Sequence, residues 1–448
     1  MENPTKQDLK HHKMTTDPIP RLVWSLAVPT IISMLIASIY NLTDTFFVGK
    51  ISTQATASVG IVFPVIALIY AFGFFFGHGS GIFISQKLGQ RETDMANVMG
   101  TVGLFSSFFG GLFIAAIGII LLEPISILLG STPTILPYTQ SYLQITLLGA
   151  PFMMASLVLN NMLRYQGNAM YGMIGMVAGA VINIGLDPLF IFTFDMGVAG
   201  AALATVVSQL ISFVLLLIMN ERSGGIKIRF IYMKPALYLF REMAKGGVPS
   251  LLRQGLASVA VILLNKAAGI HGDVAIAAMS IVGRITMFCG MVMIGFGQGF
   301  QPVCAFNYGA NLYGRVKAAY SYCNKVCLAF LLVVTAILVI FATPIVTVFR
   351  REDVEVIAIG VRALRFQCIS LPLGGFIALN NMMLQALGRS VKASVIASAR
   401  QGIFFIPFIL IMPRLFGLDG LLMTQTAADI MTFIIAVPLS IGVLRELK

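Results

Sequence analysis

The chain has 448 residues, of which 58% are hydrophobic and only 11% are charged. Soluble domains carry about 25% charged residues, so this composition excludes a fully water-exposed molecule and indicates a chain embedded in a lipid bilayer. The formal net charge of +12 would suit nucleic acid, but no basic stretch interleaved with aromatic residues is visible, and we expect no nucleic-acid partner.

A membrane-spanning helix needs about 20 apolar residues. The first 20 residues are polar and basic and lack the apolar core of a cleavable signal peptide, so we expect the first span to direct membrane insertion. We then predict twelve spans: Leu22–Phe47, Ser58–Ser85, Val98–Leu121, Ile135–Leu163, Tyr171–Phe194, Ala199–Asn220, Met243–Ala267, Val274–Phe306, Ala318–Phe349, Val356–Ala386, Val391–Pro413 and Gly420–Leu444. The expected fold class is an all-α integral membrane protein with twelve transmembrane helices.

Five sequence landmarks recur in the same order about 220 residues apart. They are Pro29 and Pro249, Phe76-Gly77-His78-Gly79 and Phe296-Gly297-Gln298-Gly299, Gly89 and Gly309, Asn160-Asn161 and Asn380-Asn381, and Gly197-Val198-Ala199-Gly200 and Gly417-Leu418-Asp419-Gly420. A constant offset indicates duplication. We therefore predict two pseudo-symmetric six-helix lobes around a central cavity: a tail at 1–21, a first lobe at 22–220, a polar linker at 221–242 and a second lobe at 243–448.

The placement of basic residues predicts the orientation in the membrane. Most of the 30 lysines and arginines fall in segments that share a side with the two termini. The opposite side receives only Lys50, Lys266, Arg350, Arg351 and Arg414. Because cytoplasmic loops are enriched in Lys and Arg, we expect a multi-pass protein of the cytoplasmic (inner) membrane with both termini in the cytoplasm.

Acidic residues inside spans are costly and point to function. Asp44 lies in the outer part of the first span and Asp187 lies within the fifth, four residues after Asn183 and therefore on the same helix face. Carboxylate and amide oxygens suit a proton or a small hard cation. The alternative is two separate acids, each paired with a local donor. A third acid, Asp429, has threonines nearby that could satisfy it: Thr424, Thr426 and Thr432.

The chain resembles the multidrug and toxic compound extrusion (MATE) family of secondary transporters, and its bacterial multidrug-exporter branch in particular. The likeness runs from about Arg21 to Arg445. The resembling stretches are Leu26-Ala27-Val28-Pro29, Asn41-Leu42-Thr43-Asp44-Thr45-Phe46-Phe47-Val48-Gly49, Gln86-Lys87-Leu88-Gly89, Gln166-Gly167-Asn168, Asn183-Ile184-Gly185-Leu186-Asp187-Pro188 and Gly197-Val198-Ala199-Gly200.

This resemblance implies an alternating-access antiporter, not an enzyme, that exports cationic and often aromatic drugs in exchange for protons or sodium ions. It implies no cofactor beyond the coupling ion, small organic cations as partners, and we expect a monomer. The implied sites are a proton or Na⁺ site at Asp44, Asn183, Asp187 and Thr205, substrate contacts at Tyr40, Asn160 and Met176, and a hinge at Pro29.

The second lobe departs from one branch of this family. That branch carries a glutamate about two turns after the proline of the seventh span, whereas Pro249 is followed by no acid up to Ala257. The tenth span also lacks the aspartate of that branch. We therefore expect ion coupling in the first lobe.

Two other functions remain open at this level. A lipid-linked oligosaccharide flippase would need cationic residues in its cavity, for which the candidates are Arg253, Arg284, Arg362 and Arg365. An intramembrane aspartyl protease is a remote alternative, because neither Asp44 nor Asp187 follows a Gly-x-Gly sequence. Zinc-protease and nucleotide-binding motifs are absent from the sequence.

Overall fold

The computed structural model describes residues 6–349 and 353–447, and these residues form helices and no strand. The elements are α1 (Lys6–Thr16), α2 (Ile19–Gly49), α3 (Thr53–Gly89), α4 (Thr93–Ile120), α5 (Leu122–Leu128), α6 (Leu136–Tyr165), α7 (Ala169–Pro188), η1 (Leu189–Thr193), α8 (Gly197–Arg222), η2 (Phe230–Tyr232), α9 (Leu237–Gly269), α10 (Asp273–Gly309), α11 (Tyr313–Ile340), α12 (Ala342–Phe349), α13 (Val354–Ala386), α14 (Ser390–Ser398), η3 (Ala399–Ile403) and α15 (Phe405–Glu446). Two of the predicted outer basic residues, Arg350 and Arg351, lie outside the described residues.

Within the described residues, eleven helical stretches are long and apolar enough to cross a membrane. The last stretch, Ser390–Glu446, has 57 residues. At 1.5 Å per residue it would extend about 85 Å, far more than the roughly 30 Å apolar core of a bilayer. It is broken at Gly417, whose φ of 59° lies in the left-handed region that favours glycine. The stretch therefore contains the two predicted spans Val391–Pro413 and Gly420–Leu444, which confirms the twelve-helix fold.

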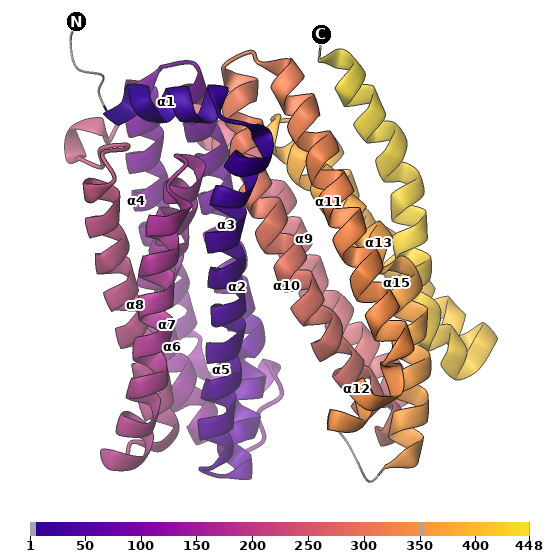
Figure 1. The fold of residues 1–448 in the computed structure, drawn as a ribbon. Helices are drawn as coiled ribbons and strands as arrows, with labels where there is room; N and C mark the ends of the chain where they lie inside the picture. The colour runs from indigo at the N-terminus through magenta and orange to yellow at the C-terminus, as the bar shows by residue number, and fades with distance from the viewer. Residues whose placement is uncertain (1–5, 350–352, 448) are drawn as a thin grey trace, which may run out of the picture.

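The described ends of the chain lie at the same end of the molecule, as an even number of spans requires (Figure 1). The first lobe, drawn in indigo to magenta, contains α2 to α8, and the second lobe, drawn in orange to yellow, contains α9 to α15. The ribbons of the lobes meet at the end that carries the termini and diverge toward the other end (Figure 1). We call the end with the termini the terminal end.

The backbone repeats with the same offset as the sequence. Positive φ angles occur at Arg91 (64°) and Asn311 (59°), which are sequence equivalents, and again at Gly197 (54°) and Gly417 (59°). A non-glycine residue with positive φ is uncommon, so finding it at matching turns is independent evidence for duplication. The two lobes are therefore copies of one six-helix unit.

Equivalent glycines bring the lobes into close contact. A Cβ atom on Gly79 of α3 would collide with the backbone of Met243 at the start of α9, and one on Gly299 of α10 would collide with Ala27 of α2. Toward the terminal end, Gly89 and Gly309 each pack against the backbone of the other helix, α10 and α3 respectively. These reciprocal contacts seal the lobes together over the terminal half of the molecule.

Buried polar side chains cross this seal. On the first lobe, Arg164 donates to Gln298 Oε1 of α10 at 2.6 Å and lies 3.4 Å from His78 Nε2. His78 Nδ1 is 3.2 Å from Ser250 Oγ of α9, which accepts a bond from Gln385 Nε2 at 2.7 Å. All five side chains are at most 2% exposed. Because buried polar groups are expensive to leave unpaired, this network favours the closed arrangement of the lobes at this end.

The N-terminal helix α1 lies across the terminal end (Figure 1) and is bonded to both lobes. On the side of the first lobe, Lys10 Nζ donates to the carbonyl of Ser223, directly after α8, at 2.8 Å, and His11 Nε2 lies 3.1 Å from Gly89 O. On the second lobe, Asn307 Nδ2 donates to Met14 O at 3.1 Å, and Arg315 donates to the carbonyl of Asp17 at 2.7 Å. The helix is therefore a tie between the lobes.

Candidate functional site

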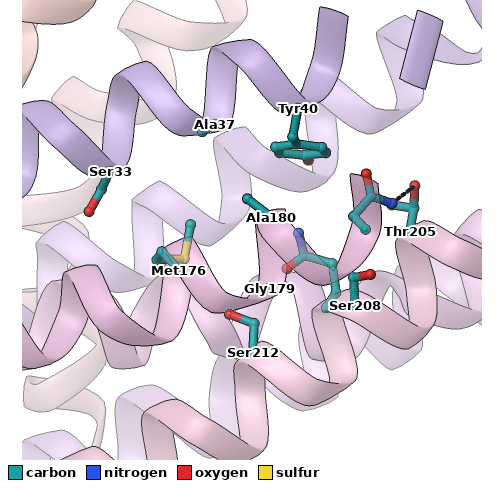
Figure 2. A pocket seen from close by; sticks show the side chains of 11 residues that line it. Ser33, Ala37, Tyr40, Met176, Gly179, Ala180, Thr205, Ser208 and Ser212 are labelled. Carbon is teal, nitrogen blue, oxygen red and sulfur yellow. Dashed lines mark hydrogen bonds between the residues drawn. The ribbon is translucent and has the colours of Figure 1, made fainter. Parts of the chain in front are cut away.

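A small pocket lies inside the first lobe, between α2, α7 and α8 (Figure 2). Its volume is about 20 Å³, which is room for one water molecule or one small ion and too little for an aromatic drug. The lining residues are Ser33, Ala37 and Tyr40 from α2, Met176, Gly179, Ala180 and Asn183 from α7, and Thr205, Ser208, Gln209 and Ser212 from α8.

The local sequence explains why α7 and α8 lie so close together at this pocket. A Cβ atom on Gly175 would lie 2.5 Å from Leu216 Cδ2, and one on Gly179 would lie 2.8 Å from Ser212 Cβ, so only glycine permits this approach. The polar residues of α8 recur three, four and seven positions after Thr205 and therefore share one helix face, which points into the pocket.

Two buried carboxylates stand beside the pocket. Asp187 is 0% exposed and Asp44 is 8% exposed, and the two interact electrostatically. Asn183, which lines the pocket, donates through Nδ2 to Asp187 Oδ1 at 3.4 Å and to Thr205 Oγ1 at 3.5 Å. Both bonds are long, so the amide holds neither oxygen tightly.

Four oxygen atoms of this site have no hydrogen-bond partner in the described structure: Asp44 Oδ1, Asn183 Oδ1, Asp187 Oδ2 and Ser208 Oγ. An unpaired buried oxygen is costly, and an isolated buried carboxylate more so. Hard oxygen ligands of this kind suit a proton or Na⁺. The alternative in which each acid is paired with a local donor therefore does not hold for Asp44 Oδ1, which has no partner. Asp187 has only the long bond from the Asn183 amide.

Tyrosines close the site around the acids. Tyr40 OH lies 3.0 Å from Tyr70 OH of α3, and Tyr142 of α6, which is 2% exposed, interacts electrostatically with Asp44 and Asp187. These phenols have apolar rings and polar tips, so they screen the acids from lipid while offering hydroxyl groups nearby. Polar residues of three helices, α2, α3 and α6, therefore lie around the acids.

The structure brings most of the predicted site residues together. Tyr40, Met176, Asn183 and Thr205 line the pocket, and Asp44 and Asp187 adjoin it through Tyr40 and Asn183. Asn160 lies apart from the lining on α6, half-buried, where its amide faces Gly172 at the start of α7.

Several residues at the pocket were not predicted from the sequence. They differ in whether a sequence pattern could have revealed them. The polar face of α8 could have been found from its helical spacing. Ser33 lies seven residues before Tyr40 on the same face of α2. Nothing in the sequence around Tyr70 distinguishes it from other aromatic residues of α3.

Pro29 lies in the first half of α2, buried where α10 packs against it, and α2 remains one helix through this residue. Two hydroxyls bond back to carbonyls one turn earlier next to it: Thr30 to Leu26 O at 2.7 Å and Ser33 to Pro29 O at 2.9 Å. Such bonds compete with backbone bonding and bend helices.

In the second lobe, the buried acid Asp429 is fully paired. Arg400 Nε donates to Asp429 Oδ1 at 2.8 Å and its Nη2 donates to Oδ2 at 3.3 Å, and Gln425 Nε2 donates to Oδ1 at 2.8 Å. The expectation that nearby threonines satisfy Asp429 is wrong, because the hydroxyls of Thr424, Thr426 and Thr432 all donate to backbone carbonyls.

The four arginines considered for a flippase are spread over different environments. Arg284 and Arg365 are exposed, and Arg362 is paired with Asp419 at the surface. Only Arg253 is partly buried between the lobes, where its Nη1 donates to Asn381 Oδ1 at 3.4 Å. They do not form the cluster that a pyrophosphate would need.

The chain matches the MatE family model twice, over residues 29–189 and 249–411, in agreement with the internal repeat. It is 30% identical to the multidrug export protein MepA of Staphylococcus saprophyticus, over 90% of this chain and 89% of that protein. It is 29% identical to MepA of Staphylococcus haemolyticus, with the same coverage.

A solved structure with a similar fold is described as the outward-facing conformation of a multidrug resistance MATE family transporter of the MOP superfamily. It is 26% identical, with a TM-score of 0.91 and coverage of 100% of both chains. The two family matches together extend over most of the chain, and the fold agrees along its whole length. The chain therefore belongs to the MATE family, whose members are membrane transporters and not enzymes.

Proposed function

We propose that this transporter is a secondary active antiporter that exports cationic, often aromatic drugs in exchange for protons or sodium ions by alternating access. The names of its staphylococcal relatives support drug export. The observation that carries the proposal is the pair of buried carboxylates, Asp44 and Asp187, with unpaired oxygens beside a pocket in the first lobe.

The coupling ion acts as a substrate of this site. A proton or Na⁺ taken up by Asp44, Asn183, Asp187 and Thr205 would neutralise the buried acids and supply the missing partner of their unpaired oxygens. The same negative charge would attract an organic cation. An ion drives transport only through different affinities for the two conformations, so binding of ion and drug must be mutually unfavourable.

The pocket volume supports this exclusion. The space of about 20 Å³ admits the ion but not a drug. A drug bound by Tyr40, Asn160 and Met176 requires α2 to move away from α7 and α8. Pro29 is the hinge in this proposal, because its missing N–H removes one backbone bond from α2 and the neighbouring Thr30 and Ser33 hydroxyls compete for others.

The proposed orientation in the membrane follows from the placement of the basic residues. Both termini face the cytoplasm, so the terminal end is the inner end and the structure is closed toward the cytoplasm. The first lobe is taken as 22–220, the linker as 221–242 and the second lobe as 243–448. The transporter works as a monomer, because one chain supplies both lobes.

The test is gradient-driven efflux of ethidium from proteoliposomes, with an imposed proton gradient or an imposed sodium gradient. Wild type is compared with Asp44→Asn and Asp187→Asn. The matched control is Asp195→Asn, an exposed acid at the outer end of the same lobe whose φ of 52° suits asparagine.

We expect efflux with one gradient, its loss in both site variants and its retention in the control. The gradient that works names the ion. Efflux by Asp187→Asn at the wild-type rate would overturn the coupling site, and absence of efflux of any organic cation with either gradient would overturn antiport itself.

A further inference from the structure

The linker that joins the lobes is held against the first lobe by hydrogen bonds. The amide of Ile226, a buried residue, donates to Gln166 Oε1 directly after α6 at 2.9 Å. The amide of Lys227 donates to Asn97 Oδ1 of α4 at 2.7 Å. At the terminal end, the carbonyl of Ser223 also accepts a bond from α1. The start of the linker is therefore a fixed part of the protein surface at this end.

The next part of the linker exposes large apolar side chains. Phe230 and Ile231 of η2 are 79% and 75% exposed, and Leu237, the first residue of α9, is 86% exposed. Apolar side chains of this size gain free energy by leaving water. Several of them close together on a surface mark a site of contact with a membrane or another molecule.

The position of Phe230 indicates which neighbour it has. Its ring centroid lies 5.0 Å from that of Phe105 on α4, a helix that packs against α3 and α6 of its own lobe. Phe105, Phe109 and Phe113 follow one another at intervals of four residues and share a helix face. Phe109 is 56% exposed and Phe113 is 66% exposed on a membrane-spanning helix, so this face is turned to lipid. Phe230 continues this lipid-facing row toward the terminal end.

Basic side chains flank the apolar ones. Residues 222–241 include five lysines and arginines and no aspartate or glutamate. All five are exposed, and none of them takes part in an ion pair within the described part of the chain. Lys227, Arg229 and Lys234 lie within four residues of Phe230. The positive-inside rule accounts for basic residues here but not for the exposed apolar side chains among them.

We propose that the linker is an anchor for anionic phospholipids. Lys227, Arg229 and Lys234 bind the headgroup phosphate, and Phe230 and Ile231 contact the acyl chains. Basic residues beside apolar ones at the membrane surface favour anionic lipid, because a zwitterionic headgroup carries its own cation and gains less from them. The combination was not visible in the sequence, since it depends on which side chains are exposed. It needs only a chain that spans a bilayer and is independent of the export proposal.

The test places a fluorescent reporter in the linker. Trp24 is the only tryptophan of the sequence, so Trp24→Phe gives a background in which Phe230→Trp reports on the linker alone. The full-length protein is reconstituted in vesicles of equal parts phosphatidylglycerol and phosphatidylcholine. One of the two lipids carries bromine on its acyl chains, which quenches a tryptophan that it contacts. The matched control is Phe113→Trp in the same background, at the far end of the α4 row.

We expect phosphatidylglycerol to be preferred at the linker reporter by about fivefold over phosphatidylcholine, the factor that one Lys or Arg near an anionic surface supplies. The triple variant Lys227→Gln/Arg229→Gln/Lys234→Gln should lose this preference, and added salt should weaken it in the parent chain. The reporter at position 113 should show no preference. Unchanged quenching at that position in the triple variant shows that the variant is folded in the bilayer.

Three results would each overturn the inference. Equal quenching of the linker reporter by the two lipids would mean contact without headgroup recognition. Absence of quenching by either lipid would place Phe230 in water or against another macromolecule. A preference that persists in the triple variant, or that is equally strong at position 113, would mean that these three charges do not select the lipid. Failure of ethidium efflux would reject antiport and leave the quenching results unaffected.

Discussion

The two lobes are built on one backbone plan but differ in what fills the same place. The first lobe has Ala180 and Gln209 at the pocket, and their equivalents in the second lobe are Arg400 and Asp429, which form an ion pair. The pair occupies the position that is left open in the first lobe.

The comparison shows that the two lobes share one backbone fold, and that the side chains at equivalent positions determine whether a buried acid is paired or left with unpaired oxygens. An acid held by an arginine and a glutamine, as Asp429 is, has its oxygens satisfied and gains little from a cation. Acids with unpaired oxygens, such as Asp44 and Asp187, gain a partner when an ion arrives. Among the described residues of the second lobe, Asp429 therefore does not supply an equivalent of the proposed first-lobe ion site.

The largest expected effect is a difference in efflux rate between a variant of a first-lobe acid and a variant of the second-lobe acid. We predict that Asp187→Asn lowers gradient-driven efflux on the order of 100-fold, the upper range for coupling between two ligands. Asp429→Asn should keep efflux within about twofold of wild type per folded molecule. Initial rates of ethidium efflux in proteoliposomes measure this, and an equal loss in both variants would break the comparison.

The ion pair of the second lobe should matter for stability instead. Arg400→Met leaves Asp429, whose side chain is 3% exposed, without its cation. We predict a loss of about 3 kcal/mol in the free energy of unfolding, the low end of the range for a broken buried pair because the Arg400 side chain is 31% exposed.

The double variant Arg400→Met/Asp429→Leu should recover most of that stability, since it removes both charges. Denaturant unfolding of the purified protein in detergent provides the measurement. If the double variant is no more stable than Arg400→Met, the buried charge is not the cause of the loss.

Replacing either glycine of the reciprocal contact between the lobes should lower the free energy of unfolding by a similar amount. Gly89→Ala and Gly309→Ala each place a Cβ atom against the backbone of the other lobe. We predict that each variant lowers the free energy of unfolding by about 1–3 kcal/mol, the cost of overpacking. Gly60→Ala, where nothing lies within 4 Å, is the control. Clearly unequal losses would show that the seal is less symmetric than the backbone.

The smallest effect should come from the exposed ion pair of the second lobe. The side chains of Arg362 and Asp419 are 52% and 45% exposed. We predict that Arg362→Gln changes the free energy of unfolding by less than about 1 kcal/mol, because solvent screens such pairs. A loss as large as that of Arg400→Met would mean that burial does not govern the difference between the two pairs.

The fold was largely accessible from the sequence because its determinants are local. Long apolar runs set the spans, and the glycines at 197 and 417 mark turns that only a residue tolerant of positive φ adopts easily.

The site was accessible only in part. Asp44, Asn183 and Asp187 stand out as polar residues in apolar helices, and the family resemblance connected them with Thr205. The pairing of Arg400 with Asp429 depends on residues of two different helical segments, and the pocket volume depends on how closely α2 approaches α7 and α8. Such distances are tertiary properties that helical periodicity does not encode.

The tie formed by α1 has a consequence for observing the transport cycle. Since α1 and the adjoining Asp17 are bonded to Gly89 of the first lobe, to Ser223 directly after α8, and to Asn307 and Arg315 of the second lobe, the lobes cannot separate at this end while all four contacts persist. In the proposed transport cycle, each separation of the lobes at the terminal end must free one end of this eleven-residue helix. A protease that cleaves near Thr16 would then cut the chain at a rate set by how often the lobes separate at the terminal end in this proposed cycle.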